Sequence, residues 1–257
     1  MSSAVFDDKY ILQSVEKAGS VLNLFFRFPD LGPSDVAKEL NITKGTAFRL
    51  LVTLENAGLL IRTDKARYRL SMRIFSLGQL AYNRLELTGI SHNYLIKLME
   101  ETGESAFLAI SSGRQDIIYL DCIQCKSIVR VDITLGSYYQ AHCTGVGKAI
   151  LAFQPDSFLN SYLELADFTP ITDYSLTSKE QFMNELSMIR RSGIAYDNQE
   201  SEIGLTCYAA PILDYEGHSI AAVSICGPLS RMAYKSDEKI EAVKRIAKEI
   251  SGQISHS

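Results

Sequence analysis

The 257-residue chain lacks an apolar run of about 18 residues that is free of charge, so it predicts no membrane-spanning helix. Its N-terminus, Met1 to Lys9, is polar and acidic and lacks the basic and apolar regions of a secretory signal. Cysteine is scarce as well, and an odd set confined to the second half disfavours a secreted disulfide framework. We therefore expect a cytoplasmic protein without a membrane partner. Its cysteines should be reduced thiols: Cys122, Cys125, Cys143, Cys207 and Cys226.

Signatures of common enzymes are also missing. There is no G-x-S-x-G, no P-loop and no dinucleotide fingerprint. Cys122 and Cys125 form a C-x-x-C, but it falls at the predicted end of a strand, and the histidines and other cysteines show no metal-ligand spacing. We expect no catalytic residue, no metal and no cofactor. A small metalloenzyme and a thiol-based redox-sensing transcription factor stay open as alternatives.

Positive charge is concentrated near the N-terminus of a chain that is acidic overall. Residues 1–85 carry twelve Lys and Arg against eight Asp and Glu, whereas residues 86–257 carry fourteen against twenty-two. The imbalance is sharpest over residues 44–73, where seven basic side chains face only Glu55 and Asp64. This stretch favours docking of a polyanion, and an ordinary solvated surface is the alternative.

The first part of the chain predicts three helices and a hairpin. Pro29 ends the first helix, and Pro33 suits the first turn of the second. Asn41 suits a tight turn at positive φ, Thr43 suits an N-cap, and Gly58 suits a helix end. The helices are expected over residues 11–28, 33–40 and 43–58, the hairpin over 59–70, and a further helix over 71–87.

The second part of the chain mixes both periodicities and predicts an α+β domain whose sheet is mostly antiparallel. Strands are expected over residues 105–111, 116–122, 128–133, 208–213 and 219–226, and helices over 92–101, 147–153, 178–192 and from 237 onward. No Gly/Ser-rich or Pro-rich linker separates the two parts, so we expect a helix to join them. The expected domains are residues 1–70, a linker helix over 71–87, and residues 88–257.

The second and third predicted helices fit a helix-turn-helix. Ala37 is small enough for the crossing of the two helices, Asn41 suits the turn, and apolar residues fix the angle between the helices. The N-terminal end of the third helix would then enter the major groove, where Arg49 is the strongest candidate for a base or phosphate contact. Phe48 could pack on a thymine methyl or the sugar backbone, or it could cover the helical core.

A basic hairpin directly after the third helix strengthens this interpretation, because it predicts a wing lying against the DNA backbone. The expected DNA-binding residues are Ser34, Thr43, Lys44, Gly45, Thr46, Phe48, Arg49, Arg62, Lys65 and Arg67. The expected partner is double-stranded operator DNA.

Six stretches together resemble the IclR family of bacterial transcriptional regulators. They are residues 14–18, 42–51 and 58–60 in the first part, and 141–152, 192–197 and 204–211 with 222–228 in the second. The resemblance implies a winged helix-turn-helix domain, a GAF-like effector domain, and a homodimer or tetramer. It further implies repression or activation of transcription under the control of a small metabolite. We expect a repressor of a catabolic operon whose effector is an organic or sugar acid.

The resemblance also implies an effector site, carried over by position to Gly145, Val146, Asp197, Cys207, Ser224 and Cys226. Cys226 departs from the serine that is frequent there in relatives binding small keto acids. Physical reasoning supports the site, because Gly145 to Gly147 open a helix whose N–H groups suit a carboxylate. Tight packing at the glycines, and a core role for the two cysteines, are the alternatives. Ile128, Val131 and Tyr139 are expected to wall the pocket.

Overall fold

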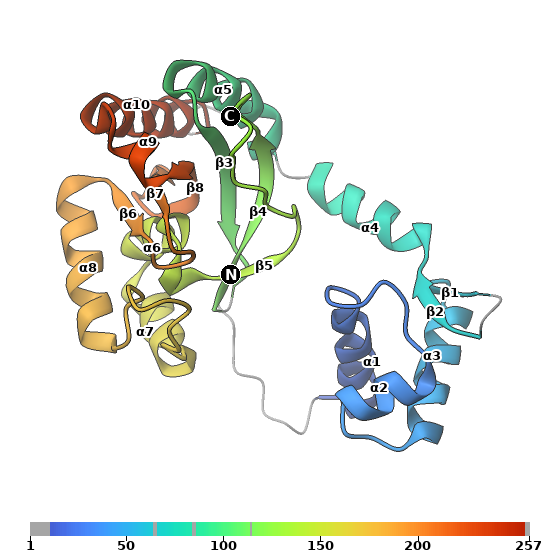
Figure 1. The fold of residues 1–257 in the computed structure, drawn as a ribbon. Helices are drawn as coiled ribbons and strands as arrows, with labels where there is room; N and C mark the ends of the chain where they lie inside the picture. The colour runs from blue at the N-terminus through green and yellow to red at the C-terminus, as the bar shows by residue number, and fades with distance from the viewer. Residues whose placement is uncertain (1–10, 64–65, 84–85, 114, 255–257) are drawn as a thin grey trace. The chain divides into compact units, whose positions relative to one another are not determined.

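The computed structural model describes residues 11–63, 66–83, 86–113 and 115–254 (Figure 1). The chain divides into two compact units, residues 1–85 and 86–257, and each is described by itself. Among the described residues no helix is long and apolar enough to cross a membrane.

The first unit begins with three helices around one small core. They are α1 (Gln13–Leu24), α2 (Pro33–Glu39) and α3 (Lys44–Asn56). The three predicted helices are confirmed, as are the positive φ of Asn41 (50°) and the N-cap at Thr43. Val36, Ala47 and Leu51 are completely buried in this core, and Ala37, expected at the helix crossing, packs against it partly buried.

The predicted hairpin follows α3. Strands β1 (Leu60–Arg62) and β2 (Tyr68–Leu70) are antiparallel, with Leu60 opposite Leu70. Leu31 pairs with Tyr68 and so attaches the segment before α2 to the same small sheet. The core below the hairpin contains Leu31, Leu60 and Tyr68, each at most 1% exposed. This is the winged helix-turn-helix arrangement that the sequence predicts.

The two helices predicted over residues 71–87 and 92–101 are both present, with different bounds. α4 spans Met72–Asn83 and α5 spans Glu86–Thr102, and residues 84–85 between them lie outside the described residues. α4 buries little of its apolar surface: Met72 is 74% exposed, Phe75 61% and Leu80 57%. An exposed apolar helix face of this size is typical of a surface that contacts another protein surface.

A six-stranded antiparallel sheet forms the centre of the second unit, in the order β5-β4-β3-β8-β7-β6. The strands are β3 (Ser105–Ser111), β4 (Asp116–Ile123), β5 (Tyr138–Gln140), β6 (Ala195–Asn198), β7 (Leu205–Leu213) and β8 (Ser219–Pro228). Each face is covered by helices (Figure 1). On one side pack α5, α9 (Leu229–Ala233) and α10 (Ser236–Ile254), and on the other α6 (Gly145–Ala152), α7 (Asp156–Leu165) and α8 (Lys179–Ser192).

The predicted strand over residues 128–133 is wrong, because this segment is an irregular loop without a strand partner. Its alternating apolar pattern has another cause: Val131 packs on the sheet core while Ile128 is 97% exposed. Among the α-helices and strands, α7, α9, β5 and β6 were not predicted. The two missed strands are only 3 and 4 residues long, too short to show a period.

Candidate functional site

The N-terminal end of α3 is exposed and well defined. Thr43 Oγ1 accepts the N–H of Thr46 at 3.2 Å and lies 2.9 Å from Thr46 Oγ1, which fixes the first turn of the helix. Ala47 and Leu51 are buried, so the side chains between them must point outward. The outward face consists of Lys44, Gly45, Phe48, Arg49, Val52 and Thr53.

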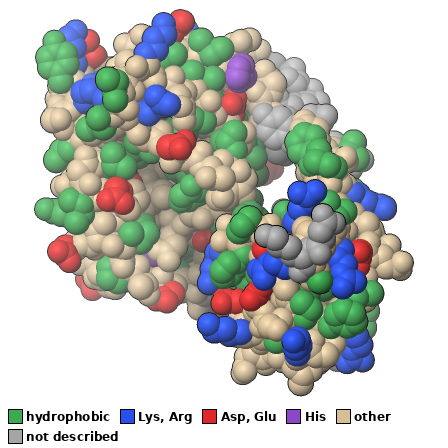
Figure 2. Space-filling model, turned by 45° about the vertical axis from the view of Figure 1, so that its right-hand side comes forward, with side chains coloured by type: hydrophobic (Ala, Val, Ile, Leu, Met, Phe, Trp, Pro, Cys, Tyr) green, Lys and Arg blue, Asp and Glu red, His purple; other side chains and the backbone are tan. Residues whose placement is uncertain are grey.

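The charges on this face are available to a ligand. Within the described part of the chain, neither Lys44 nor Arg49 forms an ion pair with a carboxylate. Phe48 is 46% exposed, so part of its ring is accessible to a ligand. Ser34 is exposed at the start of α2. Figure 2 shows Lys and Arg side chains spread over the visible face of this unit.

The wing differs from its prediction in one important respect. Arg67 is not a free cation, because its guanidinium pairs with Asp30 and lies 2.8 Å from Asp35 Oδ2. The hydrogen bond to Asp30 raises the pKa of Arg67, and the backbone N–H of Gly32 lowers the pKa of Asp35. Arg62 is exposed and lies over the Tyr68 ring at 6.0 Å. Lys65 lies outside the described residues.

The carried-over effector residues meet on one face of the large sheet. Asp197 of β6 is the register partner of Cys207 on β7, and Cys207 is the partner of Cys226 on β8. Cys226 in turn pairs with Ser105 on β3, so four neighbouring strands contribute to one row. Ser224 belongs to the next row of the same face, between Ala209 and Phe107.

The start of α6 lies directly over this row. A Cβ built on Gly145 would be 3.4 Å from the backbone N of Asp197 and 3.5 Å from Cys207 Cβ. Glycine therefore gives the helix N-terminus its close approach to the sheet. Thr144 caps the helix by accepting the N–H of Gly147, which leaves the N–H groups of Gly145 and Val146 for another acceptor. A carboxylate suits that position.

Asp197 is held by its own turn. One carboxylate oxygen accepts the N–H of Glu200 at 2.8 Å and that of Ser201 at 3.3 Å, and the other accepts the Ser201 hydroxyl. Burial raises the pKa of Asp197 despite these hydrogen bonds. The side chain is 1% exposed, so its first role is to shape the segment at the edge of the site.

A buried lysine that the sequence analysis missed lies behind this turn. Lys148 of α6 is completely buried, and its ammonium pairs with Glu200 and lies 3.6 Å from Glu185 of α8. Burial raises the pKa of Glu200, while the Lys148 charge opposes that rise. Glu200 Oε2 has no hydrogen-bond partner among the described residues. The only advance signal was a lysine in an otherwise apolar helix, Gly145–Ala152.

The prediction of reduced thiols is wrong for two of the five cysteines. Cys207 and Cys226 form a disulfide, and Cys122, Cys125 and Cys143 are free. The cause is the strand register, which puts the two residues directly opposite each other with Cα atoms 4.2 Å apart. Sequence separation alone could not reveal this pairing, because it depends on how β7 and β8 align.

Two of the three expected wall residues reach the sheet core. Val131 and Tyr139 pack against it, and the Tyr139 ring meets that of Tyr119 edge-on at a centroid distance of 5.2 Å. Ile128 does not reach the core and is exposed to solvent. The wall around the candidate site is therefore partly aromatic.

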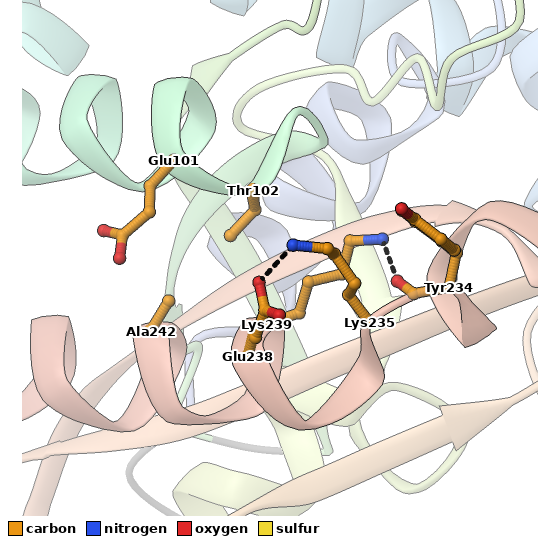
Figure 3. A pocket seen from close by; sticks show the side chains of 7 residues that line it. All are labelled: Glu101, Thr102, Tyr234, Lys235, Glu238, Lys239 and Ala242. Atoms are coloured by element: carbon orange, nitrogen blue, oxygen red, sulfur yellow. Dashed lines mark hydrogen bonds and ion pairs between the residues drawn. The ribbon is translucent and has the colours of Figure 1, made fainter.

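Two other polar clusters of this unit lie away from the candidate site. A hollow of about 150 Å³ between α5 and α10 is lined by the residues drawn in Figure 3: Glu101, Thr102, Tyr234, Lys235, Glu238, Lys239 and Ala242. Its lysines are engaged, since Lys235 pairs with Glu238 at 2.9 Å and Lys239 donates to the Tyr234 carbonyl at 2.9 Å. Asp214, Glu216 and His218 converge within 4.8 Å at the β7–β8 turn, where Asp214 already accepts two backbone N–H groups.

Comparison with known proteins agrees with both units. A family model described as "IclR helix-turn-helix domain" matches residues 14–64, and "Bacterial transcriptional regulator IclR C-terminal" matches residues 79–252. XynR of Escherichia coli K12, an HTH-type transcriptional regulator, is 31% identical over 224 residues, covering 86% of this chain and 88% of XynR.

Two further relatives span nearly the whole chain. The E. coli K12 transcriptional repressor AllR is 29% identical over 246 residues, covering 94% of this chain and 86% of AllR. The crystal structure of Thermotoga maritima IclR has a TM-score of 0.69 at 31% identity and covers 95% of this chain and 99% of that one. The chain therefore belongs to the IclR family of bacterial transcriptional regulators, which are DNA-binding proteins with an effector domain and not enzymes.

Proposed function

We propose that the protein is a cytoplasmic repressor of a catabolic operon and that a small organic or sugar acid controls it. The observation that carries the proposal is the exposed end of α3, where Lys44 and Arg49 are free of intramolecular ion pairs among the described residues. Repression is favoured by the relative AllR, which is named a repressor.

The DNA contact is proposed to centre on α3. Lys44, Gly45 and Arg49 would face the major groove, Thr46 and Ser34 the phosphates, and Phe48 a thymine methyl or a sugar. Thr43 would hold the first turn in place. In the wing, Arg62 is proposed to contact the adjacent backbone together with Lys65, whereas Arg67 would have to exchange Asp30 and Asp35 for a phosphate.

Replacing Arg49 by alanine is expected to weaken operator binding by more than about 1 kcal/mol, because a charge-assisted contact at the groove is lost. The measurement is a titration of a duplex that the wild-type protein selects from a random library. Arg191→Ala is the matched control, since Arg191 is an exposed arginine of the other unit. Equal affinity of the wild type and Arg49→Ala at moderate salt would contradict the assignment.

The effector is proposed to carry a carboxylate that accepts the N–H groups of Gly145 and Val146. Ser224 and the thiol forms of Cys207 and Cys226 would supply polar contacts, Val131 and Tyr139 the walls, and Asp197 the shape of the edge. A helix N-terminus is favourable for an anion because its N–H groups and its dipole act together.

Gly145→Leu is expected to abolish binding of this acid, because a Cβ at Gly145 already lies 3.4 Å from the Asp197 backbone and a larger side chain would fill the site. Asp197→Ala is expected to weaken binding by loosening the edge. Pyruvate, gluconate and benzoate would be titrated by calorimetry, with Gly252→Leu as control because nothing lies within 4 Å of a Cβ there. Unchanged binding of an acid in both site variants would place the pocket elsewhere.

A homodimer or tetramer is proposed as the working form, with α4 in contact with a second copy. The exposed Met72, Phe75, Leu77 and Leu80 supply the apolar area, and a two-fold protein matches a two-fold operator. Phe75→Lys should reduce the mass observed by sedimentation at micromolar concentration. A monomeric wild type, both free and on DNA, would rule out this assembly.

A further inference from the structure

The disulfide lies in the middle of the candidate effector site. Asp197 on one side and Ser105 on the other are the register partners of Cys207 and Cys226, and all four residues share one face of the sheet. Both cysteines are nearly buried, with exposed fractions of 8% and 4%. The strand register places the two residues directly opposite each other, with Cα atoms 4.2 Å apart, so the sheet aligns them for a disulfide.

The surroundings of Cys207 favour its ionisation to a thiolate and so its reaction with an oxidant. The first turn of α6 lies against it, as the 3.5 Å separation between a Cβ on Gly145 and Cys207 Cβ shows. A helix N-terminus stabilises a thiolate, which is the reactive form of cysteine. The negative charge of the neighbouring Asp197 carboxylate destabilises a thiolate. That charge is partly offset, because the carboxylate accepts three hydrogen bonds and interacts favourably with the Lys148 ammonium.

The three free cysteines have different environments. Burial raises the pKa of Cys122 to about 11 and also raises that of Cys143, so both remain protonated thiols at neutral pH. Burial opposes ionisation of Cys125 too, but hydrogen bonds with Ser105 and Ser127 outweigh it and lower its pKa. Cys125 is therefore the competing target for an oxidant, although no second sulfur is bonded to it.

We propose that Cys207 and Cys226 form an oxidation site for hydroperoxides, which makes occupancy of the effector site depend on the redox state of the cell. The statement about the effector rests on the proposed function; the oxidation site does not. In the first step the Cys207 thiol attacks the O–O bond, giving a sulfenic acid and releasing an alcohol or water. In the second step the Cys226 thiol displaces the sulfenic oxygen as water and forms the disulfide. Two electrons pass from the two sulfurs to the peroxide.

Oxidation would change the site chemically. The reduced pair offers two weak S–H donors beside Ser224, whereas the disulfide offers none. The disulfide also ties β7 to β8 under the start of α6. A peroxide signal would then alter the response of the regulator without any change in metabolite concentration.

The test uses the full-length protein, reduced, freed of reductant and treated with a small excess of hydrogen peroxide. Thiol titration should fall from five to three, and peptide mapping should find Cys207 joined to Cys226. Dithiothreitol should restore all five. In Cys125→Ser, the matched control, two of the remaining four thiols should still be lost, and in Cys207→Ser the linked peptide should disappear.

Mapping of the wild type decides the matter even if a variant folds poorly. Recovery of Cys207 and Cys226 as free thiols after peroxide treatment, or oxidation that is confined to Cys125 or abolished by Cys125→Ser, would overturn the proposal. This result does not depend on any ligand. A failure of pyruvate, gluconate and benzoate to bind the reduced protein would count against the proposed effector and leave the cysteine map unaffected.

Discussion

Lys148→Met is expected to lower the free energy of unfolding of the second unit by about 3–5 kcal/mol, because it removes the cation from a buried cluster of carboxylates. Lys148 is completely buried and pairs with Glu200 and Glu185, and Asp197 lies in the adjoining turn. Methionine has a similar volume, so lost charge rather than lost packing dominates. Urea unfolding followed by circular dichroism at neutral pH measures the change.

The effect should depend on pH in a defined direction. Burial raises the pKa values of Asp197 and Glu200, so the folded state binds protons more tightly than the unfolded chain, whose carboxyl pKa values lie near about 4. The contribution of Asp197 and Glu200 to the free energy of unfolding therefore falls as the pH rises from their pKa values in the unfolded chain to their pKa values in the folded protein. Without the Lys148 charge, the pKa values of Asp197 and Glu200 in the folded protein rise further, so the pH range over which stability is lost extends upward. At about pH 5 more of these carboxyl groups are protonated, and Lys148→Met should recover part of its lost free energy of unfolding.

Lys244→Met is the control, because Lys244 forms an exposed ion pair with Glu241 on α10, a kind of pair worth at most about 1 kcal/mol. If Lys148→Met and Lys244→Met unfolded at the same urea concentration, Lys148 would not be compensating buried charge.

Gly147→Ala is expected to cost about 3 kcal/mol, the upper end of the range for overpacking, although alanine favours a helix. A Cβ at Gly147 would lie 2.7 Å from the carbonyl carbon of Ala141 and closer still to the carbonyl oxygen. These are backbone atoms of the short helix η2 (Ala141–Cys143), so no side chain can rotate away. Thermal unfolding measures the loss.

Gly145→Ala provides the contrast within the same turn. Its Cβ would lie 3.4 Å from Ala209 Cβ, an ordinary contact, so a change of less than about 1 kcal/mol is expected. Equal stability of the two alanine variants would contradict this prediction, because the backbone of η2 would then move away from α6 without a loss in the free energy of unfolding.

The first unit could be predicted well because its signals are local. Asn41 in the turn, Thr43 at the cap and the apolar stripe of α3 are each decided within a few residues of chain. The outward face of α3 follows from the residues that are buried in the core, Ala47, Leu51 and Leu54. The pairing of Arg67 with Asp30 did not, because the two are 37 residues apart and meet only when the hairpin folds against the segment before α2.

The candidate effector site could be predicted only in part, because its residues come from segments far apart in the sequence. Gly145, Asp197 and Cys207 were placed by resemblance to a family, and the structure brings them together. The Lys148–Glu200 pair spans 52 residues and the disulfide depends on the register of β7 and β8. The strand predicted over residues 128–133 is a loop, because an alternating apolar pattern also arises where a loop lies on a core.

The pairing of Arg67 with Asp30 and Asp35 has a consequence for the search along DNA. Two carboxylates pair with the Arg67 guanidinium in the absence of DNA, so the wing attracts phosphate less strongly than its number of basic residues suggests. In the proposed wing contact, fewer counterions would then be released on arbitrary DNA, so sequence-independent binding would be weaker than the count of basic residues implies. Under that proposal, an internal anion that competes with phosphate would shorten the time that the protein spends on DNA other than its operator.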